Sequence, residues 1–179
     1  MEFQIYNLKV VKKLVLFLSI CMFLFSCQEK KEFSSIEPNN WSKRTVDLNN
    51  KDSLVSGKTY LSVYSQIYSS SEDRTHNLTV TVSMKNINLN DTIYVEKANY
   101  YDTKGNLIRT YFDKDIFIAP LETVEIIIDE VDQHGGTGAN FVFSWKKEKQ
   151  TNDPHFESIM ISTFGQQGLS FTSQGIKLE

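Results

Sequence analysis

The stretch LTVTVSMK, residues 78–85, decides the fold class of this chain. Its apolar side chains (Leu78, Val80, Val82 and Met84) alternate with polar ones, so an extended backbone would place them all on one face. A strand with one apolar and one polar face is typical of an antiparallel sheet that covers a core on one side. The stretch therefore predicts antiparallel β structure.

Similar runs occur on both sides of this stretch, and none of them shows an apolar stripe at helical spacing over three turns. The runs are Thr59–Tyr68, Thr92–Tyr101, Leu107–Tyr111, Thr123–Asp129, Phe141–Lys146, Phe156–Thr163 and Leu169–Phe171. Turn-forming residues separate them, and Gly105 in the segment 102–105 is expected to take a positive φ in a hairpin. The pattern predicts an antiparallel β-sandwich of about seven to nine strands, with an open barrel as the alternative.

The core of this domain is expected around Phe141, Phe143 and Trp145, which fall on one face of a single run. We expect the β domain to cover residues 58–179, a length that can bury one core. The preceding residues 27–57 are polar and lack periodicity, which is typical of a flexible tether. Trp41 is an exception within the tether, and we expect it to dock on the domain.

The first 26 residues have the pattern of an export signal. Three lysines (Lys9, Lys12 and Lys13) precede the apolar run Leu14–Phe25, which is shorter than the roughly 20 residues that span a bilayer. Ser26 and Cys27 end this run as in a lipobox, so Cys27 is expected to be lipidated and to become the mature N-terminus. The alternative is an ordinary cleaved signal peptide followed by an incidental cysteine.

The cysteine content agrees with lipidation. Cys21 leaves with the signal peptide, so the mature chain keeps only Cys27 and forms no internal disulfide. Acyl chains on this residue would hold the protein on a membrane. The expected location is the cell envelope, on the periplasmic or outer-membrane face, with surface exposure as a further alternative.

The charge of the chain argues against nucleic acid as a partner. The formal net charge is −3, and removal of residues 1–26 leaves 16 basic and 21 acidic residues. Phosphate binding requires a clustered basic face, which the downstream sequence lacks. We therefore expect no nucleic-acid partner, and no motif indicates a cofactor.

Four motifs occur in order along the β domain: YSQIY at residues 64–68, YYDTKG at 100–105, GGTGANF at 135–141 and SFTSQG at 170–175. Together they resemble an uncharacterised family of exported bacterial proteins, known only as a domain of unknown function. The resemblance covers nearly all of the β domain and none of the tether. It implies a domain of about this length and no particular activity.

The segment 129–140 is the richest candidate site. Three of the chain's eight glycines lie within four positions there, after an acidic cluster and before the expected core strand. Such a loop can bring bare backbone N–H groups close to an anion or a sugar. The candidate ligand-binding residues are Asp132, His134, Gly135, Gly136, Gly138 and Asn140. The favoured alternative is a tight connection whose glycines only permit positive φ. A Ca²⁺ site on the acidic cluster has the wrong spacing for an EF-hand, so no metal site is predicted.

Catalysis could involve His134, with Asp132 two residues away or with Glu157. Glu157 shares a strand face with Ile159, so its carboxylate should face water or be paired, and Arg109 is a possible partner. An ion pair is favoured over a general acid or base. No nucleophile motif accompanies these residues.

The preferred function is a non-catalytic binding or interaction module, held at the envelope by its lipid and facing an envelope protein or a glycan. A small-ligand or carbohydrate binder using the Gly135–Gly138 loop is one alternative. A hydrolase using His134 is the other. Two short patterns around Ser53 and Thr92 also resemble a bacterial O-glycosylation signal.

Overall fold

The computed structural model describes residues 41–49, 51, 53–164 and 167–178. The predicted signal peptide, Cys27 and the first part of the tether lie outside the described residues. The first element of these residues is the short helix α2 (Trp41–Arg44). Within the described ranges, no helix has the length and apolar content needed to cross a bilayer.

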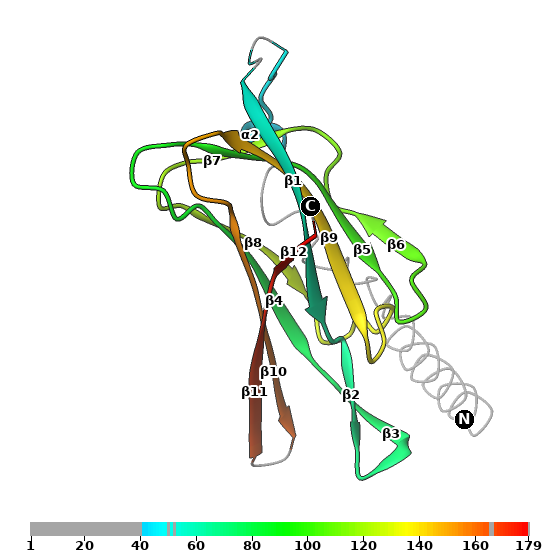
Figure 1. Cartoon of the computed structure of the whole chain (residues 1–179). Helices are drawn as coiled ribbons and strands as arrows, with labels where there is room; N and C mark the ends of the chain where they lie inside the picture. The colour runs from blue at the N-terminus through cyan, green and yellow to red at the C-terminus, as the bar shows by residue number, and fades with distance from the viewer. Residues whose placement is uncertain (1–40, 50, 52, 165–166, 179) are drawn as a thin grey trace, which may run out of the picture. The chain divides into compact units, whose positions relative to one another are not determined.

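Two antiparallel sheets and one separate hairpin make up the β domain (Figure 1). The six-stranded sheet contains, in spatial order, β12 (Ile176–Lys177), β1 (Leu54–Val63), β9 (Ala139–Glu148), β5 (Ile93–Tyr101) and β6 (Leu107–Thr110), with β7 (Ile116–Ile118) also on β5. The four-stranded sheet contains β11 (Gln167–Gln174), β10 (His155–Phe164), β4 (Thr79–Lys85) and β8 (Thr123–Ile128). The hairpin contains β2 (Gln66–Ser69) and β3 (Ser71–Asn77).

The core lies between the two larger sheets, as the alternating pattern predicts. Phe141, Phe143 and Trp145 of β9 are fully buried, which confirms their expected place at the centre. Phe143 stacks on Phe156 of the opposite sheet, with the ring centroids 4.3 Å apart. Burial of these rings contributes much of the apolar area that stabilises a sandwich without a disulfide.

The predicted antiparallel β-sandwich is confirmed, and the described strands do not close into a barrel. The number of strands is higher than the seven to nine expected, because twelve are found in the described residues. Three of them (β3, β7 and β12) lie outside the predicted runs, since they are very short or lack apolar alternation. The run 59–68 also divides into β1 and β2, because the backbone leaves the sheet at Tyr64 and Ser65.

Trp41 docks on the domain, as expected. Its ring lies 4.8 Å from the ring of Phe112, and it packs against the core. Arg44 of the same helix forms an ion pair of 2.6 Å with Glu122. The backbone N–H of Val46 then donates to Asp115 O at 2.9 Å. Described residues before position 58, the expected start of the β domain, therefore pack against that domain.

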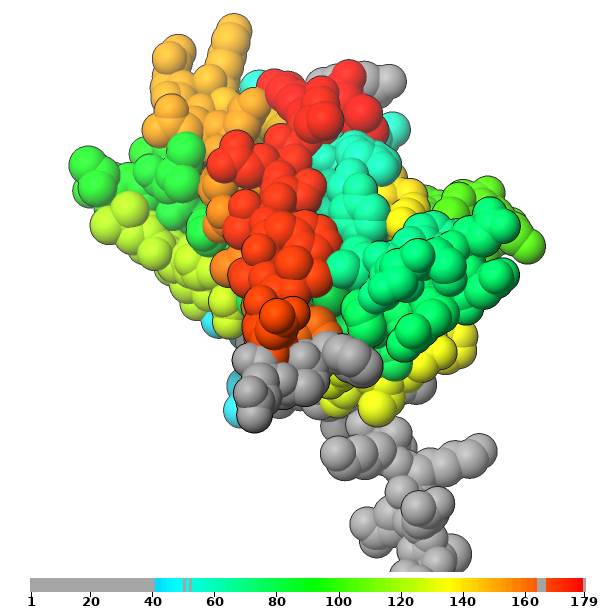
Figure 2. All heavy atoms as spheres, turned by 90° about the horizontal axis from the view of Figure 1, so that it is seen from below, coloured from blue at the N-terminus to red at the C-terminus, as the bar shows by residue number. Residues whose placement is uncertain are grey.

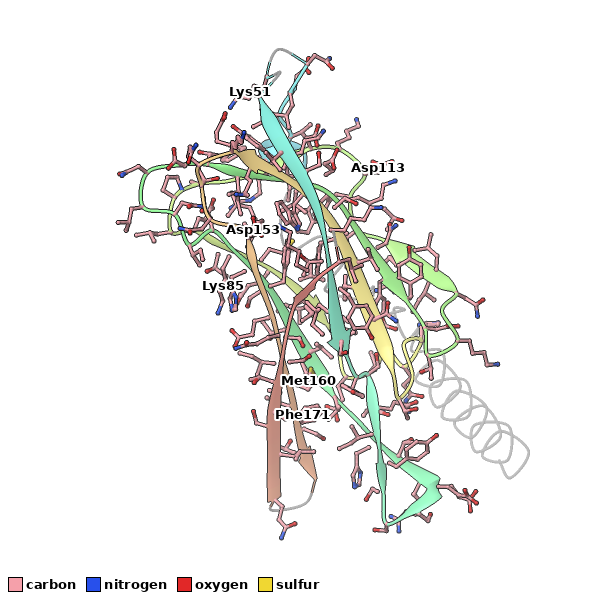
Figure 3. All side chains as sticks on the ribbon, in the orientation of Figure 1. Lys51, Lys85, Asp113, Asp153, Met160 and Phe171 are labelled. Atoms are coloured by element: carbon pink, nitrogen blue, oxygen red, sulfur yellow. The ribbon has the colours of Figure 1, made fainter. Side chains whose placement is uncertain are left out.

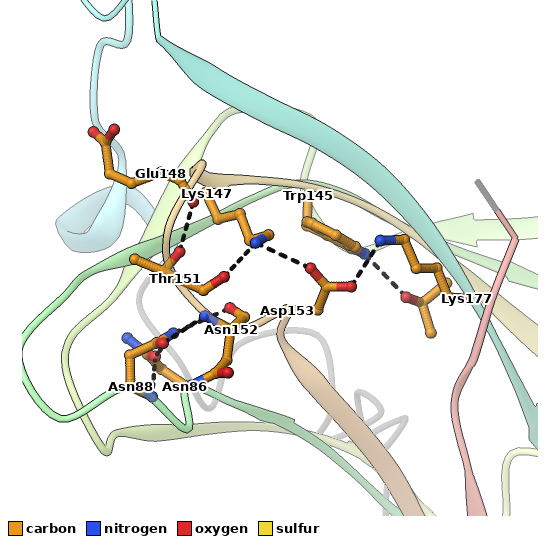
Figure 4. Close-up of polar contacts among 10 residues, drawn as sticks. Asn86, Asn88, Trp145, Lys147, Glu148, Thr151, Asn152, Asp153 and Lys177 are labelled. Carbon is orange, nitrogen blue, oxygen red and sulfur yellow. Dashed lines mark hydrogen bonds and ion pairs between the residues drawn. The ribbon is translucent and has the colours of Figure 1, made fainter.

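The end of the chain connects both sheets. Strand β11 pairs with β10 in one sheet, and β12 pairs with β1 in the other. Gly175 lies between them, and a Cβ at this position would be 2.7 Å from Thr59 Cγ2 and 3.0 Å from Phe156 Cβ. Asp153 fixes the segment further, because its carboxylate is 3.3 Å from Lys147 Nζ and 2.8 Å from Lys177 Nζ (Figure 4).

The hairpins β2–β3 and β10–β11 extend beyond the main sandwich at the same end (Figure 1), and Figure 2 shows this end from below, with β11 beside the β2–β3 hairpin. Tyr64, just before β2, makes an edge-to-face contact of 5.8 Å with Phe171 of β11. Phe171 is paired in register with the fully buried Met160 of β10 (Figure 3). The core therefore continues into the base of these hairpins.

Candidate functional site

The carboxylate of Asp132 is the centre of the predicted loop site. Its side chain is fully buried. Arg109 Nη1, on β6, donates to Asp132 Oδ2 at 2.9 Å, and His134 Nδ1 lies 2.7 Å from Asp132 Oδ1. Arg109 Nη1 also donates to Tyr111 Oη at 2.9 Å. Both carboxylate oxygens are therefore engaged by the protein, and the loop is attached to β6.

The ionisation of Asp132 follows from these contacts. Burial alone would raise its pKa, but hydrogen bonds from His134 and Arg109 outweigh the burial and hold the pKa below its ordinary value. The side chain of His134 is 60% exposed. Asp132 is thus a buried, ionised carboxylate that holds the exposed imidazole of His134 in place.

The glycines of the loop serve its close packing. A Cβ on the buried Gly135 would overlap the Tyr100 hydroxyl and lie 2.6 Å from Ser65 Oγ. Gly136 has a φ of 71°, which favours glycine, and its carbonyl accepts from the N–H groups of Ser65 and Gln66, both at 3.1 Å. Thr103 donates to Gly135 O through both its N–H (3.2 Å) and its hydroxyl (3.0 Å). These contacts support the interpretation of the loop as a tight connection.

Three of the four sequence motifs meet at this point, which we name the motif junction: Ser65, Tyr100, Gly135 and Phe141. The hydroxyls of Ser65 and Tyr100 are 2.7 Å apart, and Gly135 covers them. The ring of Tyr100 stacks on Phe141 with centroids 4.8 Å apart. Burial raises the pKa of the Tyr100 phenol, so the hydroxyl stays neutral. Residues of these motifs thus share a structural role in the interior.

The structure brings only some of the six predicted loop residues into contact with one another. Asp132 and His134 are paired, whereas Gly135 and Gly136 are fixed against neighbouring segments. Gly138 is half-buried, and a Cβ there would lie 3.4 Å from Thr103 Cγ2. Asn140 belongs to β9, where the register places it between Ser62 of β1 and Tyr101 of β5.

The predicted pairing of Glu157 with Arg109 is wrong. Glu157 Oε2 lies 2.6 Å from Lys85 Nζ, across the four-stranded sheet. The hydrogen bond from Lys85 lowers the pKa of Glu157. Arg109 instead pairs with Asp132. Arg109 belongs to β6, the edge strand of the six-stranded sheet, and this strand lies beside the 129–140 loop. The preference for an ion pair at Glu157 is confirmed, with a different partner.

A feature that the sequence prediction missed is the bulge at Glu96. The pairing of β5 with β9 shifts its register between Val95 and Lys97, so Glu96 is an extra residue in the strand. Glu96 Oε1 lies 2.6 Å from Lys146 Nζ. The signal is present in the sequence, because apolar alternation stops at Val95 and resumes out of phase at Ala98.

Two hollows adjoin this bulge, and Glu96 lines both. The larger, of about 530 Å³, is lined by carboxylates and lysines, namely Asp47, Glu96, Lys97, Asp113, Lys114 and Asp115. The smaller, of about 150 Å³, is lined by Ser56, Gly57, Lys58, Glu96 and Ser144. We name the two hollows together the Glu96 site.

The charges around the Glu96 site affect one another. Burial raises the pKa of Asp115; Lys146 opposes this effect, and the nearby charges of Glu96 and Asp47 raise the pKa further. The hydrogen bond with Glu96 raises the pKa of Lys146. Across the part of the chain that is described, no three His, Cys, Asp or Glu side chains are grouped to hold a metal ion. The carboxylates and lysines that line the site can donate and accept hydrogen bonds.

The fold and the buried motif junction define a two-sheet antiparallel β-sandwich domain. The chain belongs to the DUF3124 family, described as proteins of unknown function, whose model matches residues 56–178. Among solved structures, the chain is similar to Thermotoga maritima 1070, with 7% identity and a TM-score of 0.44. That match covers 67% of this chain and 92% of the other. None of the curated proteins that were compared matches the chain.

Proposed function

We propose that this protein is a lipid-anchored, non-catalytic binding module of the bacterial cell envelope. The observation that carries the binding role is the Glu96 site. A bulge re-aims a side chain out of the regular ladder, and here it places Glu96 between two open hollows. Concave sites with a few convergent polar groups are the usual form of ligand sites.

The loop 129–140 supports the non-catalytic part of this proposal. The glycines are used to fit the loop against its neighbours, and no nucleophile motif accompanies His134 in the sequence. A rigid, internally bonded loop gives the domain a stable end. The acidic mature chain lacks the clustered basic face that nucleic acid requires. The partner at the cell envelope is therefore an envelope protein or a glycan.

Anchoring depends on Cys27. We expect the wild-type protein to take up a palmitate analogue and to sediment with membranes, whereas Cys27→Ala should take up no label. Each buried CH₂ contributes about 0.8 kcal/mol, so two or more acyl chains hold a protein lastingly on a bilayer. Fractionation of cells that express either form checks this result. Label retained in Cys27→Ala, or wild-type protein free of membranes, would contradict the anchor.

A hydrolase remains the second candidate, because His134 Nδ1 lies 2.7 Å from Asp132 Oδ1, as in the base and orienting acid of a catalytic triad. We expect esterase, glycosidase and peptidase screens of the purified protein to give no turnover. Activity that is lost in His134→Ala, while Glu130→Ala keeps it, would establish the hydrolase and refute the non-catalytic module.

A further inference from the structure

We infer that the outer face of the six-stranded sheet, from the Glu96 site to Tyr60 and Tyr101, binds a neutral glycan chain. This inference rests on the proposed binding function and names the ligand class of the same site. Three observations carry it: the balance of charge, the small side chains that form the smaller hollow, and the adjoining rows of tyrosine, asparagine and hydroxyl side chains.

The charges at the Glu96 site are balanced. Four carboxylates line the larger hollow, namely those of Asp47, Glu96, Asp113 and Asp115. Four ammonium groups accompany them, because Lys97 and Lys114 line the same hollow, Lys58 lines the smaller one, and Lys146 bonds Glu96. Neither an anion nor a cation is favoured by such a surface. Closely spaced donors and acceptors instead match hydroxyl groups, which donate and accept together.

The smaller hollow arises from small residues in neighbouring strands. Ser144 of β9 stands between Lys58 of β1 and Lys97 of β5 in the pairing register. Ser56, two residues before Lys58 on β1, lines the hollow as well. Gly57 lies in the same strand, but a Cβ at this position would point to the inner face of the sheet and overlap the Trp145 ring. The lack of a side chain at Gly57 therefore does not widen the hollow on the outer face. The hollow thus has hydroxyls at its base and longer charged groups around it.

Two uncharged rows continue from the hollow along the same sheet face. The first row joins Tyr60, Val142 and Asn99 in register. The second joins Ser62, Asn140 and Tyr101. This second row gives the predicted ligand residue Asn140 a place outside the glycine loop.

The side chains of these rows hold one another in place. Asn99 Nδ2 donates to Tyr101 Oη at 3.3 Å, and Thr110 Oγ1 donates to Asn99 Oδ1 at 2.8 Å. Ser62 Oγ donates to Tyr60 Oη at 3.4 Å. Both tyrosines are half-buried. Tyrosine rings offer apolar surface to sugar C–H groups, while amides and hydroxyls bind the sugar hydroxyls.

A protein partner fits this face less well. Stable protein interfaces have a core depleted in charged residues, with polar groups at the rim. Here the concave part is the charged part, and the apolar groups (Tyr60, Val142 and Tyr101) are interleaved with Asn99 and Asn140. A chain of sugar rings fits both parts of the face, because its hydroxyl groups can bond the charged hollow and its C–H groups can pack on the apolar side chains.

Calorimetric titration with linear tetrasaccharides of glucose, mannose and N-acetylglucosamine tests the inference on the full mature protein in detergent. We expect at least one of them to bind, and both Tyr60→Ala and Ser144→Gln to weaken that binding about 10-fold or more, which corresponds to about 1.4 kcal/mol. Ser144→Gln fills the smaller hollow from the outer face, so the test does not depend on Tyr60→Ala remaining folded. Tyr68→Ala is the matched control, because Tyr68 is an exposed tyrosine of the separate hairpin.

No binding of any of the three tetrasaccharides would overturn the inference, as would binding that both variants leave unchanged. Preferential, salt-sensitive binding of polygalacturonate would overturn the neutral character of the ligand. These outcomes are distinct from failure of the proposed function, because lipid labelling of Cys27 and membrane fractionation are read without any glycan.

Discussion

Gly135→Ala is expected to lower the free energy of unfolding by about 3 kcal/mol or more. The added methyl would overlap the Tyr100 hydroxyl and approach Ser65 Oγ and Ala139 Cβ within 2.6 and 2.8 Å. Relief requires the Ser65–Tyr100 hydrogen bond to break inside the core, which leaves buried polar groups unsatisfied. Urea unfolding followed by tryptophan fluorescence measures the loss.

Gly168→Ala is the control for this substitution. Gly168 is exposed in β11, and a Cβ there would meet no atom within 4 Å. We expect its free energy of unfolding to stay within about 0.5 kcal/mol of the wild type or to rise slightly. Equal stability of Gly135→Ala and wild type would contradict the close packing of the motif junction.

The second large effect is expected for Asp132→Ala, with a loss of about 3 kcal/mol at pH 7. The substitution leaves the guanidinium of Arg109, which is only 19% exposed, without its carboxylate partner. Removal of one member of a buried ion pair is costly because the remaining charge stays poorly solvated. Paired urea titrations of the variant and the wild type check this value.

The loss of unfolding free energy in Asp132→Ala should depend on pH. The folded-state pKa of Asp132 is lowered, so its stabilising contribution is complete above the unfolded value of about 3.9 and disappears as the pH falls through the folded value. The difference between wild type and Asp132→Ala should therefore shrink in acid. Glu130→Ala, which removes an exposed carboxylate from the same loop, should change stability by less than about 0.5 kcal/mol. A constant difference between pH 7 and pH 2 would show that the charge of Asp132 is not responsible.

The fold was largely predictable from local alternation. The run 78–85 became β4 with its apolar side chains inward, because a one-residue change of register would expose all of them. The short strands β3 and β7 could not be found in this way, since SEDRTHN lacks alternation and IFI is too short to show a period. Gly105 has a φ of 80° in the predicted hairpin, because the turn chemistry there is local.

The site was less predictable, because it depends on pairing across strands. The spacing of Asp132 and His134 indicates a local contact, and the contact exists. The partner of Arg109 depends instead on which loop lies beside β6, so its assignment to Glu157 failed. Glu96 was missed because the apolar alternation changes phase between Val95 and Ala98, and such a change identifies a bulge only when the register of the neighbouring strand is known.

The crossing of the chain end from β11 to β12 has a consequence for self-association. One continuous segment forms the outermost strand of both sheets along one side of the sandwich, so the two sheet edges on that side are joined through the backbone at Gly175. The opposite side ends in β8 and in β6, two separate borders whose backbone groups are open to additional strands. A strand added to β11 or to β12 would therefore disturb both sheets at once, whereas β6 and β8 can each be extended separately.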